Sequence, residues 1–293
     1  MRPVTDVIST LGECPLWSVQ EACLYWIDIE GRDVHRLDPS SGAVETVHLP
    51  GRPGSLAVTS APGMLLVAME HELVWLDWQA GTTEPWIPIE EPRPRVRLND
   101  GRCDPAGRFW VGSFDTDTSA GNHVGMLHRV GGDGSVLTVR RDIGVSNGLA
   151  FSPDGRTMYF ADSPKESVWA FDYDVDSGAA TNERLFVDFA DLPGKPDGAA
   201  VDSLGCYWVA AVFGWAIIRV TPTGKIDRIV EVPVHKPTMP AFGGSSLDQL
   251  FVTSMSAQVG PVPEPQEHAG KVLCLDVGVA GIAEPPFLGG PGG

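Results

Sequence analysis

The chain has 293 residues, is 43% hydrophobic and carries a formal net charge of −17, so it has enough apolar sequence for a sizeable core. Such acidity argues against nucleic acid or an anionic membrane as a partner, because both bind basic surfaces. The longest apolar run, at 208–218, is too short to span a bilayer. No secretory signal is visible at the start, and five scattered cysteines without a CxxC pair favour a reducing compartment. A cytoplasmic protein is therefore expected.

Short apolar runs separated by turn residues recur along the whole chain. The clearest group reads GLAFS, TMYFADS, SVWAFDYD and ERLFVDF, with turns such as SPDG between the runs. Four such runs joined by short turns predict four antiparallel strands. Six groups are expected in chain order, at about 10–50, 53–92, 97–141, 145–190, 195–233 and 236–285.

A small four-stranded sheet cannot bury both of its faces alone, whereas radial packing of several copies covers them. The repeat length of about 45 residues falls in the range of propeller blades. The sequence therefore predicts an all-β protein in which residues 1–293 form one six-bladed β-propeller, with four antiparallel strands per blade. A pair of β-sandwiches is the rival fold, but it does not explain the repeat.

Polar residues stand at the start of the first strand of each group. When the groups are aligned on their second strands, these positions are separated by 42, 44, 48, 50 and 41 residues. Because the first strand of each blade lines the central channel, the six positions are expected to form a ring around one end of it. The ring consists of Glu13, Ser55, Asn99, Asn147, Asp197 and Thr238.

Carboxylate and amide oxygens that converge without histidine or cysteine favour a hard divalent cation. Two carboxylates buried near each other also need a cation or hydrogen bonds to offset their cost. The alternative is that these polar residues only cap a water-filled channel. Asp100, next to the ring, is expected to point away from the channel and to stabilise a turn.

Four segments resemble the signature segments of one protein family. They are GECP at 12–15 with Trp17, RLNDG at 97–101, SNGL at 146–149 and PDG at 196–198. In this order they are similar to the senescence marker protein (regucalcin)/gluconolactonase/luciferin-regenerating family, over nearly the whole chain up to GVAGIAEPPF. The resemblance implies a six-bladed propeller. For many members it also implies hydrolysis of sugar lactones with one divalent cation in the channel.

The resemblance further implies roles for individual residues. The metal ligands fall on Glu13, Asn147 and Asp197, and the substrate-binding residues fall on Arg97 and Asn99. A further acidic substrate contact falls on Asp117 in the loop 113–123, where a solvated loop acid is the alternative interpretation. The cation is Ca, Zn, Mn, Mg or Fe(II), because an oxygen-rich site does not discriminate among them.

Each of these roles has a chemical reason. A lactone is an ester, and its hydrolysis needs a polarised carbonyl and a nucleophilic water, both of which a cation promotes. Asp197 is expected to be the catalytic base that accepts the proton of this water, and Asp117 is the alternative base. Arg97 and Asn99 offer the donors and acceptors that sugar hydroxyls require.

The expected function is that of a metal-dependent sugar lactonase, acting on a gluconolactone or on a pentonolactone such as arabinono- or xylonolactone. The alternatives are a calcium-binding regulatory protein and a hydrolase of organophosphate or aryl esters. A scaffold of the WD-repeat kind is disfavoured, because the GH…WD signature is missing. The expected partner is a small-molecule sugar lactone, and the chain is expected to be a monomer. The loops 113–123, 212–216 and 255–268 are expected to select the sugar.

Overall fold

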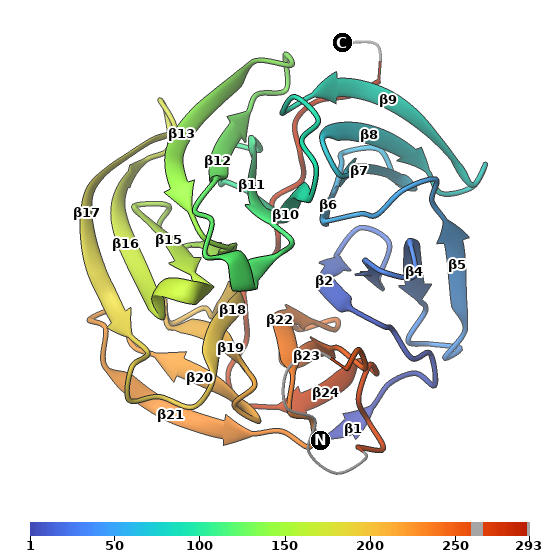
Figure 1. Cartoon of the computed structure of the whole chain (residues 1–293). Helices are drawn as coiled ribbons and strands as arrows, with labels where there is room; N and C mark the ends of the chain where they lie inside the picture. The colour runs from blue at the N-terminus through green and yellow to red at the C-terminus, as the bar shows by residue number, and fades with distance from the viewer. Residues whose placement is uncertain (259–265, 292–293) are drawn as a thin grey trace.

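The computed structural model describes residues 1–258 and 266–291, so part of the loop 255–268 lies outside the described residues. Six four-stranded antiparallel sheets surround a central axis, as Figure 1 shows along that axis. The predicted six-bladed β-propeller is therefore confirmed. Within the described ranges the helical segments are two 3-10 turns, η1 (Thr118–Ala120) and η2 (Ser163–Lys165). No described helix has the length and apolarity needed to cross a membrane.

The strands follow one another from the axis outward in five of the blades. The first blade contains β2 (Gly12–Ser18), β3 (Cys23–Asp28), β4 (Asp33–Leu37) and β5 (Val44–His48). The second contains β6 (Ser55–Val58), β7 (Met64–Ala68), β8 (Glu72–Asp77) and β9 (Thr82–Pro88). The third contains β10 (Val96–Cys103), β11 (Phe109–Asp115), β12 (Gly125–Val130) and β13 (Val136–Ile143). The fourth contains β14 (Ser146–Phe151), β15 (Thr157–Asp162), β16 (Ser167–Asp174) and β17 (Ala179–Asp188). The fifth contains β18 (Lys195–Val201), β19 (Tyr207–Val212), β20 (Ala216–Val220) and β21 (Ile226–Glu231).

The sixth blade is assembled from both ends of the chain. Its inner strands are β22 (Pro237–Gly243), β23 (Gln249–Ser254) and β24 (Leu273–Asp276), and its outermost strand is β1 (Arg2–Pro3). In the antiparallel pair of β1 with β24, Arg2 lies opposite Cys274 and Pro3 lies opposite Leu273. The N-terminal segment therefore holds the last blade against the first and closes the ring of blades. Residues 2–3 precede the expected start of the first blade, so this pairing was not among the predicted strands.

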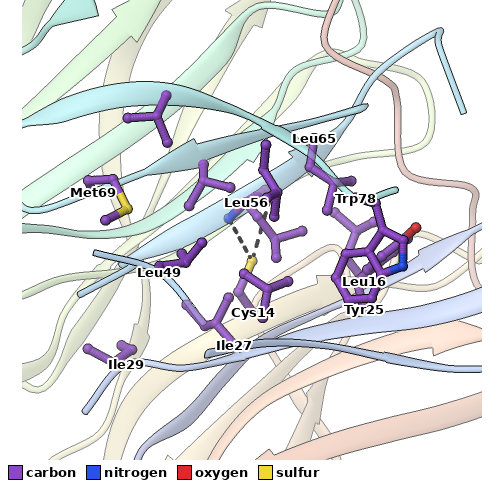
Figure 2. Packing of buried hydrophobic residues seen from close by; sticks show 14 of the residues in the cluster. Cys14, Leu16, Tyr25, Ile27, Ile29, Leu49, Leu56, Leu65, Met69 and Trp78 are labelled. Atoms are coloured by element: carbon purple, nitrogen blue, oxygen red, sulfur yellow. Dashed lines mark hydrogen bonds between the residues drawn. The ribbon is translucent and has the colours of Figure 1, made fainter. Parts of the chain in front are cut away.

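Neighbouring blades are held together by apolar side chains packed face to face. Between the first two blades, Cys14 and Ile27 from one sheet meet Leu56 and Leu65 from the next, all buried (Figure 2). The Cys14 sulfur accepts a hydrogen bond from the Leu56 backbone nitrogen at 3.3 Å. Each fully buried aliphatic side chain of this kind contributes about 1.5–3 kcal/mol. Burial also raises the pKa of the Cys14 thiol to about 12, so this cysteine is a packing residue.

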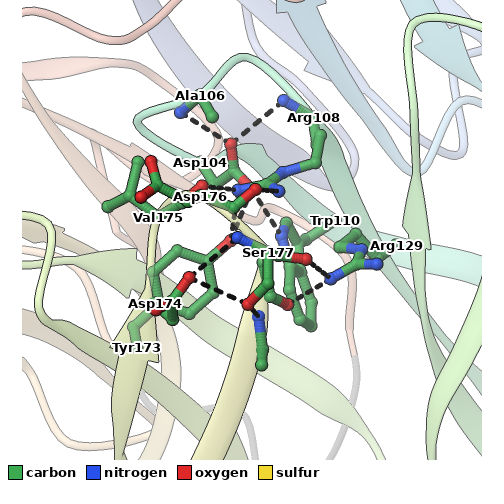
Figure 3. A network of polar contacts seen from close by, with 12 residues as sticks. Asp104, Ala106, Arg108, Trp110, Arg129, Tyr173, Asp174, Val175, Asp176 and Ser177 are labelled. Atoms are coloured by element: carbon green, nitrogen blue, oxygen red, sulfur yellow. Dashed lines mark hydrogen bonds and ion pairs between the residues drawn. The ribbon is translucent and has the colours of Figure 1, made fainter.

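A buried carboxylate fixes the first hairpin of the third blade. Asp104 accepts hydrogen bonds from Arg108 Nε at 2.6 Å, from Trp110 Nε1 at 3.2 Å and from Tyr173 Oη at 2.5 Å, and Figure 3 shows it at the centre of these donors. Its other oxygen accepts from the backbone of the turn. The fifth blade repeats the arrangement with Asp202, which accepts from Trp208 Nε1 and Arg219 Nε, both at 2.8 Å. These aspartates stabilise the hairpins that present the inner strands.

The C-terminal segment after β24 crosses the end of the propeller opposite the candidate site. In Figure 1 it is the red trace that runs behind the sheets. The backbone nitrogen of Gly281 donates to Leu247 O at 2.8 Å, and that of Phe287 donates to Val58 O at 2.8 Å. Glu284 lies in an ion pair with Arg102 of β10 at 2.6 Å. The segment therefore ties the sixth blade to the second and third.

Candidate active site

The six predicted ring positions all lie on the innermost strands, one in each blade. Four of them, which are Glu13, Asn99, Asn147 and Asp197, line a single cavity of about 490 Å³. The other two tie neighbouring strands together. Ser55 Oγ donates to Asn99 O at 2.8 Å, and Thr238 Oγ1 donates to Gly12 O at 2.5 Å. The structure thus brings the carboxylate and amide members of the ring together and gives the hydroxyl members structural contacts.

A β-bulge lies at or directly after the ring position in five of the six inner strands. The register between the first and second strands shifts after Glu13 in β2, after Asn147 in β14 and after Pro196 in β18. The strand β6, which carries Ser55, pairs without such a shift. A bulge places two residues against one and re-aims the side chains beside it. The bulges therefore include all four ring members that line the cavity, but also Thr238 of β22, which does not line it.

Three polar residues from two blades form a continuous hydrogen-bonded row in this cavity. Arg97 Nη1 donates to Asn99 Oδ1 at 2.9 Å, and Asn99 Nδ2 donates to Asn147 Oδ1 at 2.9 Å. Asn99 Nδ2 also reaches Ser146 O at 2.9 Å. Asn99, predicted to bind substrate, is thus in direct contact with Asn147, predicted to bind the cation, and Arg97 is linked to Asn147 through Asn99.

The two carboxylates of the ring lie in an unfavourable environment for negative charge. Burial raises the pKa of Glu13 well above its ordinary value, and the charges of Asp197 and Asp100 raise it further. Burial and the charge of Asp100 likewise raise the pKa of Asp197. In the described part of the chain, the Glu13 carboxylate accepts a hydrogen bond from Cys14 N at 3.2 Å.

This donor set fits a hard divalent cation, because its two carboxylates repel each other and lack a basic ion-pair partner among the described residues. The third oxygen of the set is the amide Oδ1 of Asn147. No cluster of three or more acidic, histidine or cysteine side chains with metal-binding geometry occurs in the described ranges, so the candidate set depends on this amide.

Arg97 is enclosed on the wall of the cavity. Its guanidinium stacks on the ring of Phe114, with 4.6 Å between the guanidinium carbon and the ring centroid. Burial, followed by the charge of Arg52, lowers the pKa of Arg97 to about 10, so the side chain stays cationic at neutral pH. Its Nε has no hydrogen-bond partner among the described residues. Both hydrogen bonds that the Arg97 guanidinium makes within the described ranges use Nη1, to Leu98 O and to Asn99 Oδ1, so they leave the other guanidinium nitrogens unused.

The structure does not bring Asp117 into the lining of the cavity, although Thr116 and Thr118 on either side of it do line it. The Asp117 carboxylate accepts from Arg95 Nη1 at 3.1 Å and from Ser119 Oγ at 2.6 Å. Its side chain is 38% exposed. In this conformation Asp117 belongs to an ion pair at the surface of the loop.

The spacing of the ring did not single out five other polar residues that line the cavity, which are Glu30, Thr116, Thr118, Ser163 and Lys195. Ser163, at the start of η2, lines the cavity and contacts Asn147. Asp100 does not line the cavity, but it is buried and accepts from Leu149 N at 3.0 Å in the next blade, so its expected role in stabilising a turn was wrong. Asp100 lies in β10, and its charge is near enough to Glu13 and Asp197 to raise the pKa of both. The rest of the cavity wall is largely apolar and includes Leu11, Ile29, Phe114, Val145, Val212, Phe213 and Met255.

The family model described as the SMP-30/Gluconolactonase/LRE-like region matches residues 11–256. The chain belongs to this family. The match begins before Glu13 and ends after Thr238, so it includes all six ring positions. The resemblance found in the sequence is therefore confirmed.

Two sugar lactonases and a solved structure are similar to this chain over almost their whole length. The 6-deoxy-6-sulfogluconolactonase of Pseudomonas putida is 38% identical over 283 residues, which cover 96% of each chain. The L-arabinolactonase of Azospirillum brasilense is 34% identical over 297 residues, covering 99% of this chain and 96% of the relative. Among solved structures, the calcium-binding protein regucalcin from Agrobacterium tumefaciens superposes with a TM-score of 0.92 at 28% identity, covering 98% of this chain and 96% of that one.

Proposed function

We propose that the protein hydrolyses a sugar lactone to the aldonic acid, with one divalent cation held by Glu13, Asn147 and Asp197. The observation that carries this proposal is the pair of buried carboxylates, which line one cavity together with Asn147 and Arg97. Membership of the family supports the same reaction class, as do two relatives named as sugar lactonases.

The side chains around the cavity supply binding, orientation and proton transfer. When bound, the cation contributes Lewis-acid polarisation and makes water more acidic. Arg97 and Asn99 are the proposed substrate-binding residues, with donors directed to hydroxyl or carbonyl oxygens of the sugar. Asp197 is the proposed base. A neighbouring cation favours its ionised form, in which it accepts a proton from the attacking water.

Asp117 is a proposed substrate contact that requires a different conformation of its loop. Its carboxylate reaches a bound sugar only when the pair with Arg95 opens and the loop 113–123 reorients. Phe114, in contrast, lies on the cavity wall with Arg97 stacked on it, and offers an apolar face to the ring of the sugar.

The reaction is tested by following acid release from freshly prepared lactones in weakly buffered solution. The panel contains gluconolactone, arabinonolactone, xylonolactone, galactonolactone and 6-deoxy-6-sulfogluconolactone, each with the metal-free protein and with added Ca²⁺, Mg²⁺, Mn²⁺, Zn²⁺ or Fe²⁺. We expect turnover that depends on the added cation and is absent from Asp197→Asn. Full activity of the metal-free protein, or no turnover with any pair of lactone and cation, contradicts the proposal.

Arg97→Ala separates substrate binding from cation binding. We expect a KM raised by about 10-fold or more, because a buried, stacked donor is lost. Arg97→Lys keeps the charge but not the planar fork, so it should recover only part of the loss. A regulatory calcium-binding protein would instead bind Ca²⁺ tightly while hydrolysing none of the lactones, and the same assay distinguishes this alternative.

A further inference from the structure

The hydrogen bonds around Asn147 form a chain with one direction. Arg97 donates to Asn99, Asn99 donates to Asn147, and Asn147 Nδ2 donates to Ser163 Oγ at 2.8 Å. Ser163 Oγ then donates to the backbone oxygen of Pro196 at 2.7 Å. The chain therefore crosses from the third blade through the fourth to the fifth, and it ends on the residue that precedes Asp197.

The two ends of this chain determine its direction. A guanidinium can only donate, so Asn99 must turn its amide oxygen toward Arg97. A backbone oxygen can only accept, so the single hydrogen of Ser163 is committed to Pro196 O, and Ser163 can only accept from Asn147. Asn147 must consequently turn its NH₂ group toward Ser163 and its Oδ1 toward Asn99 and the cavity. An asparagine amide is nearly symmetric in shape, so hydrogen bonds of this kind are needed to select one of its two orientations.

We propose that Ser163 is a positioning residue for the candidate cation site, because its hydroxyl fixes the orientation in which Asn147 presents an oxygen to the cavity. The inference rests on the proposed function for the role of Asn147 as a ligand. Outer partners that orient a ligand typically change metal affinity about 10–100-fold when they are removed. Ser163 also holds Pro196 O, so the same hydroxyl restrains the backbone from which Asp197 projects.

The position of Ser163 in the fold is itself fixed from two sides. The preceding residue, Asp162, accepts from Gly144 N and Val145 N, both at 3.0 Å, and this anchors the start of η2. The Ser163 backbone nitrogen donates to Val145 O at 3.3 Å. Ser163 is 8% exposed, so water has little access to replace its hydroxyl. A side chain held in this way can impose an orientation on its neighbour.

The test compares Ser163→Ala, Ser163→Thr and a matched control, Ser254→Ala. Ser254 is also buried, and its hydroxyl likewise joins two groups, donating to Lys271 O at 2.9 Å and accepting from Gly270 N at 3.0 Å. The affinity of the full-length, chelator-treated protein for Mn²⁺ is measured by electron paramagnetic resonance and that for Ca²⁺ by calorimetry. Urea unfolding of the metal-free variants reports the loss of stability separately.

We expect the Kd of Ser163→Ala for both cations to rise about 10–100-fold, and that of Ser163→Thr to stay within about 3-fold of wild type, because threonine keeps the hydroxyl. Ser254→Ala should lose stability with an unchanged Kd. Equal affinities of Ser163→Ala and Ser254→Ala overturn the inference, as does a wild-type protein that binds neither cation. A wild-type protein that binds cations but opens no lactone contradicts the proposed function alone, and the comparison of Kd values still decides the role of Ser163.

Discussion

Asn99 of β10 donates a hydrogen bond from Nδ2 to Oδ1 of Asn147 of β14, across the boundary between two blades, at 2.9 Å. One of these residues is a proposed substrate contact and the other a proposed cation ligand. A substitution of either residue therefore removes a hydrogen bond from the other. The two proposed roles therefore predict that substrate binding and cation binding depend on each other.

Asn99→Ala tests this connection. We expect a higher KM together with a several-fold weaker affinity for Mn²⁺, because Asn147 loses one of the groups that orient its oxygen. Asn147→Ala should weaken Mn²⁺ binding further, since it removes the proposed ligand itself. Steady-state kinetics at several Mn²⁺ concentrations separates the two effects. Asn99→Ala with an unchanged Kd for Mn²⁺ would show that the contact carries no such connection.

The raised pKa values of Glu13 and Asp197 predict how the stability of the metal-free protein depends on pH. A carboxyl whose pKa is higher in the folded state binds more protons there than in the unfolded state, so stability falls as pH rises from the ordinary carboxyl pKa through the raised value. Glu13→Gln removes this penalty. We expect the metal-free variant to be more stable than wild type at pH 8 by about 1.4 kcal/mol for each unit of the pKa difference, and similar to wild type at pH 4.

Urea unfolding in the presence of a chelator measures this difference, and Asp38→Asn is a control of opposite sign. Hydrogen bonds from Ser40 and Ser41 lower the pKa of Asp38 to about 2. Its ionised carboxylate therefore stabilises the folded state above the ordinary aspartate pKa, and this stabilisation is lost as pH falls toward 2. Asp38→Asn should therefore lower stability at pH 8, where Glu13→Gln raises it. If metal-free Glu13→Gln is no more stable than wild type at pH 8, the two carboxylates are not in the repulsive environment described above.

The architecture and the converging residues could be predicted because a propeller repeats one strand order at a nearly constant interval. Spacing alone placed Glu13, Asn99, Asn147 and Asp197 on the innermost strands, and the structure places all four in one cavity. Ser163 could not be found in this way, since it follows the second strand of its blade and has no place in the register of the ring. Its role depends on a contact across blades, which the interval does not encode.

Three other features lie beyond what a strand repeat can predict. The strand β1 has two residues and no apolar alternation, so its pairing with β24 leaves no pattern in the sequence. The orientation of Asp117 depends on the conformation of a loop and on the position of Arg95. Asp100 contacts the next blade and lies where the register shifts between Leu98 and Gly101, and a bulge of this kind breaks the alternation on which the expectation for Asp100 depended.

Asp104→Asn tests the hairpin network of the third blade. The substitution removes a buried negative charge and turns an NH₂ group toward donors such as Arg108 Nε and Tyr173 Oη. We expect a loss of about 2–4 kcal/mol in the free energy of unfolding. Asp154→Asn is the matched control, because Asp154 occupies a turn of the fourth blade where it is exposed and accepts from Ser152 Oγ and Arg156 N. It should cost less than about 1 kcal/mol. Equal losses would show that burial of Asp104 carries no extra stability.

Phe287→Ala tests whether the C-terminal segment stabilises the propeller without taking part in the site. Phe287 is fully buried, and its ring packs against Trp86 and Trp75 with centroids at 5.5 and 5.9 Å. Deleting such a ring leaves a cavity and costs about 3–5 kcal/mol. Leu288→Ala is the control, because this neighbour is 63% exposed and its truncation should change stability by less than about 1 kcal/mol.

The same variant also shows whether the C-terminal segment affects the candidate site as well as the stability of the propeller. Phe287 packs at the end of the propeller opposite the candidate site, so the folded fraction of Phe287→Ala should keep the wild-type Kd for Mn²⁺ and the wild-type KM. Denaturant unfolding gives the folded fraction. Below the unfolding transition, titration with Mn²⁺ gives the Kd, and steady-state kinetics gives the KM. A large drop in cation affinity in Phe287→Ala would mean that the C-terminal segment acts on the site. The ion pair of Glu284 with Arg102 would then connect the segment to Asp100, because both charges influence the pKa of Asp100.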